Sequence, residues 1–123
     1  MPMREIPRHA WTDFCDRFSR QYRGWLVSLE STGLSSGPQM QASEVPLVWI
    51  SAELQADRGD RIEVALETCT GEHRTYIIPA ATHVRLQATE EGANAGVEIE
   101  SSAGGMTRLR FRSAMLPERV DGI

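Results

Sequence analysis

Apolar side chains recur every three or four residues between positions 7 and 23, and this spacing predicts an amphipathic helix. The apolar residues that fall within an arc of about 100° on a helical wheel are Trp11, Phe14, Cys15, Phe18 and Tyr22. The opposite face carries acid–arginine pairs four residues apart, Asp13–Arg17 and Asp16–Arg20. Such pairs stabilise a helix by only about 0.2–0.5 kcal/mol each, so we expect packing of the aromatic face to decide its stability. Gly24 is expected to end the helix in a left-handed conformation.

After Gly24 the apolar period changes to two, which is typical of strands with one buried face. The segments with this pattern are residues 25–30, 39–44, 47–55, 62–67, 73–78, 82–89, 97–101 and 107–113. Pro46 and Pro79 are expected to separate neighbouring strands. The predicted fold is α+β and mainly β, with one N-terminal helix followed by seven or eight short antiparallel strands in a barrel-like or sandwiched sheet. A chain of 123 residues is expected to form a single domain over residues 1–123, with a C-terminal tail at 114–123.

The turn at residues 70–72 (Thr-Gly-Glu) predicts a hairpin with a three-residue loop. With Cys69 opposite His73, Leu66 lies opposite Tyr76. The apolar residues of the two strands then share one face. This agreement supports the register, because a slip of one residue would put them on opposite faces.

Charge is unevenly distributed along the chain. Thirteen basic residues stand against seventeen acidic ones, for a net charge of −4, and every basic residue is an arginine. Without lysine, neither Schiff-base chemistry nor a P-loop lysine is possible. Residues 25–100 hold four arginines against twelve acids. This acidic middle would repel a phosphate backbone, so we do not expect nucleic-acid binding.

The last predicted strand carries an arginine at every second position, which places the guanidinium groups on one face. The candidates for binding an anionic small molecule or an acidic protein surface are Arg85, Arg108, Arg110 and Arg112. The alternative is that Glu98 and Glu100, on the neighbouring strand, neutralise them in a cross-strand charge ladder. Guanidinium groups converging without carboxylate partners would favour an anion site, and pairing with these glutamates would count against it.

Trp49 lies in a nearly continuous apolar run at residues 45–50, where alternation is lost. Such a strand is buried on both faces or lies at an interface between subunits. Ala65 and Ile77, on the nominally outer face of the predicted hairpin, indicate the same surface. We therefore expect Trp49 to take part in a partner interface, with a homodimer as the favoured assembly.

Two short motifs have simpler structural explanations. Residues 33–37 (Gly-Leu-Ser-Ser-Gly) match the G-x-S-x-G pattern of a nucleophile elbow, which needs a strand before it, a helix after it and a large parallel sheet. Residues 58–60 (Arg-Gly-Asp) match an adhesion tripeptide and are expected to form a turn. No catalytic constellation is visible in the sequence, so we do not expect an enzyme.

Neither a metal nor a cofactor is expected. The histidines His9, His73 and His83 show no ligand spacing, and Cys69 with His73 supplies at most two of the four ligands of a structural zinc site. Cys15 lies within the apolar arc and is interpreted as a core residue. The two cysteines form no CxxC motif, and no apolar run is long enough to cross a membrane. We therefore expect a cytoplasmic protein without a membrane partner.

Short motifs over nearly the whole chain carry a resemblance to a known family. They are Arg4-Glu5-Ile6-Pro7 with Trp11, Phe18-Ser19-Arg20-Gln21, Gly24-Trp25-Leu26-Val27, Pro46-Leu47, Ile50-Ser51-Ala52, Val84-Arg85-Leu86, Leu109-Arg110-Phe111-Arg112-Ser113 and Leu116-Pro117. By these motifs the chain resembles domain-of-unknown-function family 5335, a family of small bacterial proteins. Trp49 departs from the family pattern, where a small residue is expected, so a role for it need not be shared. The resemblance implies no activity.

Three functional hypotheses remain from the sequence. The first is a non-enzymatic interaction or structural domain that self-associates. The second is a small-molecule or anion-binding β-barrel that uses the outward arginines. The third is a Sm-like or SH3-like nucleic-acid binder, suggested only by a helix followed by short strands and disfavoured by the acidic middle.

Overall fold

The structure is a computed structural model that describes residues 3–33, 37–54, 59–68, 70–88, 94–102 and 105–115, with only the backbone described at residues 38, 94 and 112–115. In chain order the elements are β1 (Met3–Ile6), the 3-10 helix η1 (Arg8–Ala10), α1 (Trp11–Tyr22), β2 (Leu26–Gly33), β3 (Pro38–Glu53), β4 (Asp60–Glu67), β5 (His73–Ala88), β6 (Asn94–Ser101) and β7 (Gly105–Met115). The first two residues of the predicted tail, 114–115, belong to β7, and residues 116–123 lie outside the described ranges.

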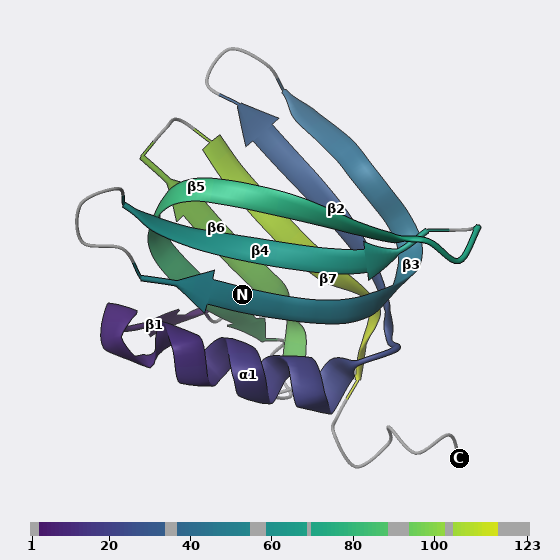
Figure 1. Ribbon diagram of the computed structural model, residues 1–123, viewed down its shortest axis with the longest axis horizontal. Helices are drawn as coiled ribbons and strands as arrows, with labels where there is room; N and C mark the ends of the chain where they lie inside the picture. Colours follow the sequence, from purple (N-terminus) through teal and green to yellow (C-terminus); the bar gives the residue numbers. More distant parts are fainter. Residues whose placement is uncertain are drawn as a thin grey trace.

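Strands β2 to β7 form an antiparallel meander in which each strand pairs with the next, and β7 returns to pair with β2. These pairings close a six-stranded barrel, so the barrel and not the sandwich is the correct alternative. β1 is an additional strand on the second half of β5. Figure 1 shows the barrel with α1 running along one side of it. The predicted class, α+β and mainly β, is confirmed.

Two long strands turn a corner of the barrel. β3 pairs with β2 through residues 38–46 and with β4 through residues 47–53, whereas β5 pairs first with β4 and then with β6. At each corner the register shifts, and a non-glycine residue has positive φ: Glu44 (φ 51°) in β3 and Ala80 (φ 52°) in β5. These irregularities are β-bulges, which bend a strand and increase its twist.

The bulges overturn part of the strand prediction. Pro46 and Pro79 were expected to end strands, giving separate segments at 39–44 and 47–55 and at 73–78 and 82–89. Each pair of segments is instead one continuous strand. The prolines lie at the two bends, where a bulged strand tolerates proline without ending.

The N-terminal segment also differs from the prediction. Residues 3–6 form β1, which the sequence did not predict, and Pro7 is extended (φ −64°, ψ 149°). One turn of 3-10 helix follows, so α1 begins at Trp11 and not at residue 7. The indole Nε1 of Trp11 donates to the Ile6 carbonyl at 2.8 Å and ties the helix to β1. The predicted end of the helix is correct, because Gly24 follows it at φ 87°.

A second contact fixes the start of the helix. The guanidinium group of Arg8 forms a bidentate pair with the carboxylate of Asp60 at the beginning of β4, with Nη2 donating to Oδ1 at 2.9 Å and Nε to Oδ2. The hydrogen bonds to Asp60, followed by its charge, raise the pKa of Arg8. The pair therefore joins η1 to the rim of the barrel.

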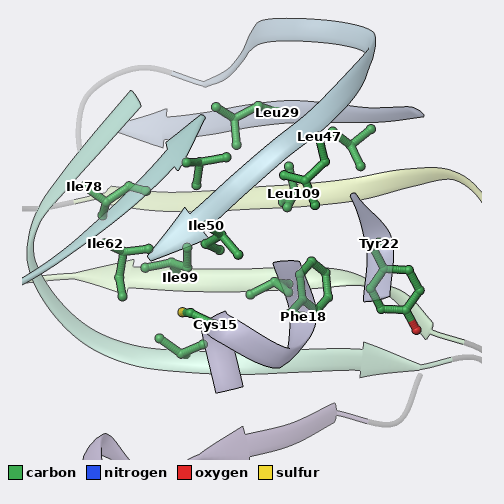
Figure 2. Packing of buried hydrophobic residues seen from close by; sticks show 14 of the residues in the cluster. Cys15, Phe18, Tyr22, Leu29, Leu47, Ile50, Ile62, Ile78, Ile99 and Leu109 are labelled. Carbon is green, nitrogen blue, oxygen red and sulfur yellow. The ribbon is translucent and has the colours of Figure 1, made fainter. Parts of the chain in front are cut away.

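The aromatic face of α1 packs into the core. Cys15, Phe18 and Tyr22 are buried, and Figure 2 shows their side chains among those of the strands. Phe111 of β7 stacks on Phe18 with 5.7 Å between ring centroids and contacts Tyr22 at 4.6 Å. Burying one large aromatic side chain contributes roughly 1.5–3 kcal/mol, several times more than a helical surface ion pair. The predicted burial of the aromatic face is therefore confirmed at Trp11, Phe18 and Tyr22.

Ser19 links α1 to an open edge of β3. Residues 47–53 pair with β4 on one side and with no described strand on the other. The Ile50 N–H donates to Ser19 Oγ at 2.9 Å, and the single hydroxyl proton of Ser19 lies between two acceptors, the carbonyls of Ile50 (2.9 Å) and Cys15 (2.7 Å). The helix thereby satisfies backbone groups that a bare strand edge would leave exposed.

The register of the β4–β5 hairpin differs from the prediction by two residues. Val64, and not Leu66, lies opposite Tyr76, and Glu67 lies opposite His73. The connection is longer than three residues, because Thr68 N–H donates to the Glu72 carbonyl at 2.7 Å. Cys69, on which the predicted register depended, lies outside the described residues. The shift is even, so each side chain keeps its predicted face.

Candidate functional site

Charged residues form one row across the outer face of five strands. Successive strand pairs place them directly opposite one another in the order Glu5 (β1), Arg85 (β5), Glu98 (β6), Arg108 (β7) and Glu30 (β2). We call these five residues the charge row. The signs alternate, so every member inside the row lies between two opposite charges, the arrangement that stabilises cross-strand pairs.

Ion pairs connect all neighbours in the charge row. Arg85 nitrogens lie 3.1 Å from a Glu5 oxygen and 3.2 Å from a Glu98 oxygen. Arg108 nitrogens lie 3.0 Å from Glu98 and 3.8 Å from Glu30. Glu98, at the centre, is only 4% exposed and accepts hydrogen bonds from both arginines. These charge-assisted hydrogen bonds therefore compensate for the cost of burying its carboxylate.

Arg85 has a third carboxylate partner, Glu100, at 3.1 Å. Burial lowers the pKa of Arg85, but its hydrogen bonds to Glu100 and Glu98 and the charge of Glu5 outweigh this effect and raise the pKa. Arg85 and Arg108 are thus held by carboxylates of the protein itself. This pairing counts against the hypothesis that they bind an anion.

The other two candidate arginines lie apart from the charge row. Arg110 is exposed opposite Gly96 and forms no ion pair within the described part of the chain. Arg112 lies in β7, but its side chain is outside the described part. The predicted ladder is present for Glu98 with Arg108, whereas Glu100 lies opposite Met106.

The apolar run at Trp49 is explained by a bulge. A register shift between Leu47 and Trp49 separates the buried residues Leu47 and Ile50 by three positions instead of two. Val48 and Trp49 lie between them and are both half-buried. The run is therefore apolar because the strand turns a corner, and Trp49 keeps part of its surface exposed.

Trp49 belongs to an apolar surface on the outer face of β3, β4 and β5. It lies opposite Ala65, which in turn lies opposite Thr75. Ile77 follows two residues later on the same face of β5 and is 56% exposed. We call Trp49, Ala65 and Ile77 the outer patch. The structure brings together the three residues that the sequence had associated with a partner interface.

Among the described residues, Cys15 and His83 lie in different surroundings. Cys15 is buried, and burial raises its pKa to about 12, so it stays a protonated and poorly nucleophilic thiol at neutral pH. His83 Nδ1 lies 3.2 Å from a carboxylate oxygen of Glu5, at one end of the charge row. Within the described ranges, no three side chains of the types His, Cys, Asp and Glu come together as metal ligands.

A groove of about 570 Å³ lies between α1 and β1. Typical small-molecule sites have volumes of roughly 300–1,000 Å³. The residues of its lining that matter here are Ile6, Phe14, Phe18 and Leu86, which are buried or half-buried, and Arg4 and Arg17, which are exposed. Sequence reasoning missed this groove because β1 was not recognised, although Arg4 and Ile6 alternate with Met3 and Glu5 as strand residues do.

The described residues define a small antiparallel β-barrel protein with one added strand and a helix that covers a strand edge. No helix in the described part is both long and apolar enough to cross a membrane. The family model of DUF5335, a family of unknown function, matches residues 2–119, so the chain belongs to this family. This confirms the resemblance found in the sequence. Comparisons with curated proteins and with solved structures gave no match.

Proposed function

We propose that this barrel is a non-enzymatic interaction domain that self-associates as a homodimer through the outer patch. The observation that carries the proposal is the apolar surface of Trp49, Ala65 and Ile77 on adjacent strands, where Ile77 is exposed and Trp49 and Ala65 are half-buried. Contiguous exposed apolar residues mark interaction sites, and tryptophan is enriched in protein interfaces.

The position of the outer patch supports this role. In Figure 1 the paired parts of β3, β4 and β5 cross the front of the barrel, and no described helix or strand lies before them. Residues 73–78 of β5 pair with β4 on one side and with no described strand on the other. A twofold axis near this edge would let two copies cover the same patch on each other.

The state of the reactive groups supports a role without catalysis. The Cys15 thiol is buried with a raised pKa, and Arg85 and Arg108 are bound by glutamates. We also propose that the protein is bacterial and cytoplasmic. The exclusive use of arginine as the basic residue supports the bacterial source. The two cysteines without a CxxC motif support the cytoplasmic location.

The substitution Ile77→Lys tests the interface. Ile77 lies opposite Glu63, so lysine gains an opposite charge in the monomer while it places a charge within the outer patch. We expect the dimer dissociation constant to rise by at least about tenfold, because an unpaired charge would be buried between the copies. Sedimentation equilibrium measures this constant.

Met40→Lys is the matched control. Met40 is 59% exposed and lies opposite Glu30, on a different part of the barrel. Its substitution should leave dimerisation unchanged. Equal effects of the two lysines would contradict an interface at the outer patch, and a wild-type species of 13.7 kDa at micromolar concentration would contradict the dimer.

A further inference from the structure

We propose that the groove between α1 and β1 binds a small amphipathic carboxylate, a molecule with an apolar chain or ring and one carboxylate group. The site lies apart from the outer patch and uses none of the arginines of the charge row. Its two parts, an apolar lining and a pair of guanidinium groups, come from different elements of the fold.

The apolar lining suits the body of such a ligand. Phe14 and Phe18 lie one turn apart on α1, with 5.7 Å between their ring centroids. Ile6 of β1 and Leu86 of β5 contribute the opposite side. The lining thus combines aromatic and aliphatic side chains with polar ones, and small-molecule sites use apolar residues for contact area and polar groups to orient the ligand.

Arg4 provides the guanidinium group on the strand side of the groove. Strand alternation puts Arg4 on the same face of β1 as the buried Ile6, and away from Glu5 in the charge row. Arg4 lies opposite Leu86, beside the apolar lining. It makes no ion pair with any described residue. This differs from Arg85, which has three carboxylate partners.

Arg17 stands on the helix side of the same groove. Its contact with Asp13 is 3.2 Å long, and the two side chains are 79% and 67% exposed. Exposed ion pairs of this kind are weak, so a ligand carboxylate can compete with Asp13. Arginine binds carboxylates through two parallel hydrogen bonds, which gives the site a preference for this head group.

The acidic residues of the lining limit the charge of the ligand. Glu5 and Asp13 also border the groove, and Glu5 is already bound by Arg85 and His83. Two fixed carboxylates would repel a multiply charged anion more strongly than a singly charged one. The presence of these carboxylates beside the two arginines therefore favours a ligand with one negative charge.

The test uses the full chain and decanoate, kept below its micelle concentration, in an NMR titration. We expect saturable shifts of the Phe14 and Leu86 amides. Arg4→Gln, and separately Arg17→Gln, should raise the dissociation constant by about tenfold, as the loss of a charge-assisted contact predicts. Decanol, which has a similar chain and no charge, should bind about tenfold more weakly than decanoate.

Arg20→Gln is the control, because Arg20 pairs with Asp16 and does not line the groove. Its affinity for decanoate should equal that of the wild type, and thermal unfolding should show that all three variants are folded. The proposal is overturned if decanoate produces no saturable shifts. It is equally overturned if decanol binds as well, or if Arg4→Gln and Arg17→Gln behave like Arg20→Gln.

Discussion

At the scale of single residues, Ser19 carries a link between helix and barrel that no apolar contact provides. It is completely buried in a helix whose other buried residues are aromatic or thiol side chains. Its hydroxyl satisfies the backbone N–H of Ile50 on an edge that lacks a described strand partner. Buried backbone groups need such partners, because leaving one unsatisfied costs as much as a lost hydrogen bond.

Ser19→Ala should therefore lower the free energy of unfolding by about 2 kcal/mol, within the range for an unsatisfied buried donor. Alanine is the better helix former, so a loss cannot come from helix propensity. Urea denaturation measures the effect. Ser43→Ala, at an exposed position of β3, should stay within about 0.5 kcal/mol of the wild type. Equal stabilities of the two variants would exclude the proposed link.

The raised pKa of Cys15 predicts that the free energy of unfolding depends on pH in the alkaline range. Its pKa is 9.0 when unperturbed and about 12 in the folded protein. Between these values the unfolded chain loses a proton that the folded protein keeps, so stability falls as pH rises and is unaffected below pH 9. From pH 8 to pH 10 the wild type should lose about 1 kcal/mol more than Cys15→Ala. Urea denaturation in reductant measures both slopes, and equal slopes would refute the shift.

At the scale of elements, local patterns predicted what lies within one helix or one strand. The aromatic arc predicted α1, and the alternation of apolar residues predicted the buried faces of β2 and β4. Long-range pairing escaped prediction. Val27 and Phe111 are direct neighbours in the closing β2–β7 pair, although they lie far apart in the sequence. The corner bulges at Glu44 and Ala80 also escaped prediction, so each nearby proline was interpreted as a strand end.

The charge row was likewise predicted only where its strands are neighbours in the sequence. Alternation was enough to place Glu98 beside Arg108, because β6 and β7 are joined by a short turn. Glu5 and Glu30 were missed as members, since their strands become neighbours of β5 and β7 only through the addition of β1 and the closure of the barrel. The same unrecognised strand concealed the groove beside Arg4.

The charge row predicts the effect of Glu98→Gln. The amide keeps the shape of the side chain but removes the charge between Arg85 and Arg108. The free energy of unfolding should fall by about 2 kcal/mol, as for hydrogen bonds to charged groups. Glu53→Gln, which alters an exposed pair with Arg61, should cost less than about 1 kcal/mol. Chemical denaturation at low salt gives both values, and a Glu98→Gln variant as stable as Glu53→Gln would contradict a structural role for the row.

At the scale of the whole molecule, three surfaces of the barrel have different characters. The arginines of the charge row are paired with its glutamates, the outer patch is apolar, and the groove combines apolar side chains with two exposed arginines. The outer patch joins apolar residues that the sequence had already singled out on three strands, because outward apolar residues interrupt the alternation, and unlike the charge row it has no charged partners within the patch. It is therefore the surface on which the functional proposal rests.

The most direct measurement is an isotope-filtered NOE experiment on a mixture of labelled and unlabelled protein. The proposal predicts contacts between copies that involve the Trp49 indole and the Ile77 methyl groups, and their loss in Ile77→Lys but not in Met40→Lys. A dimer by sedimentation whose contacts between copies lie elsewhere would contradict the outer patch. A protein that remains monomeric under the same conditions would contradict self-association itself.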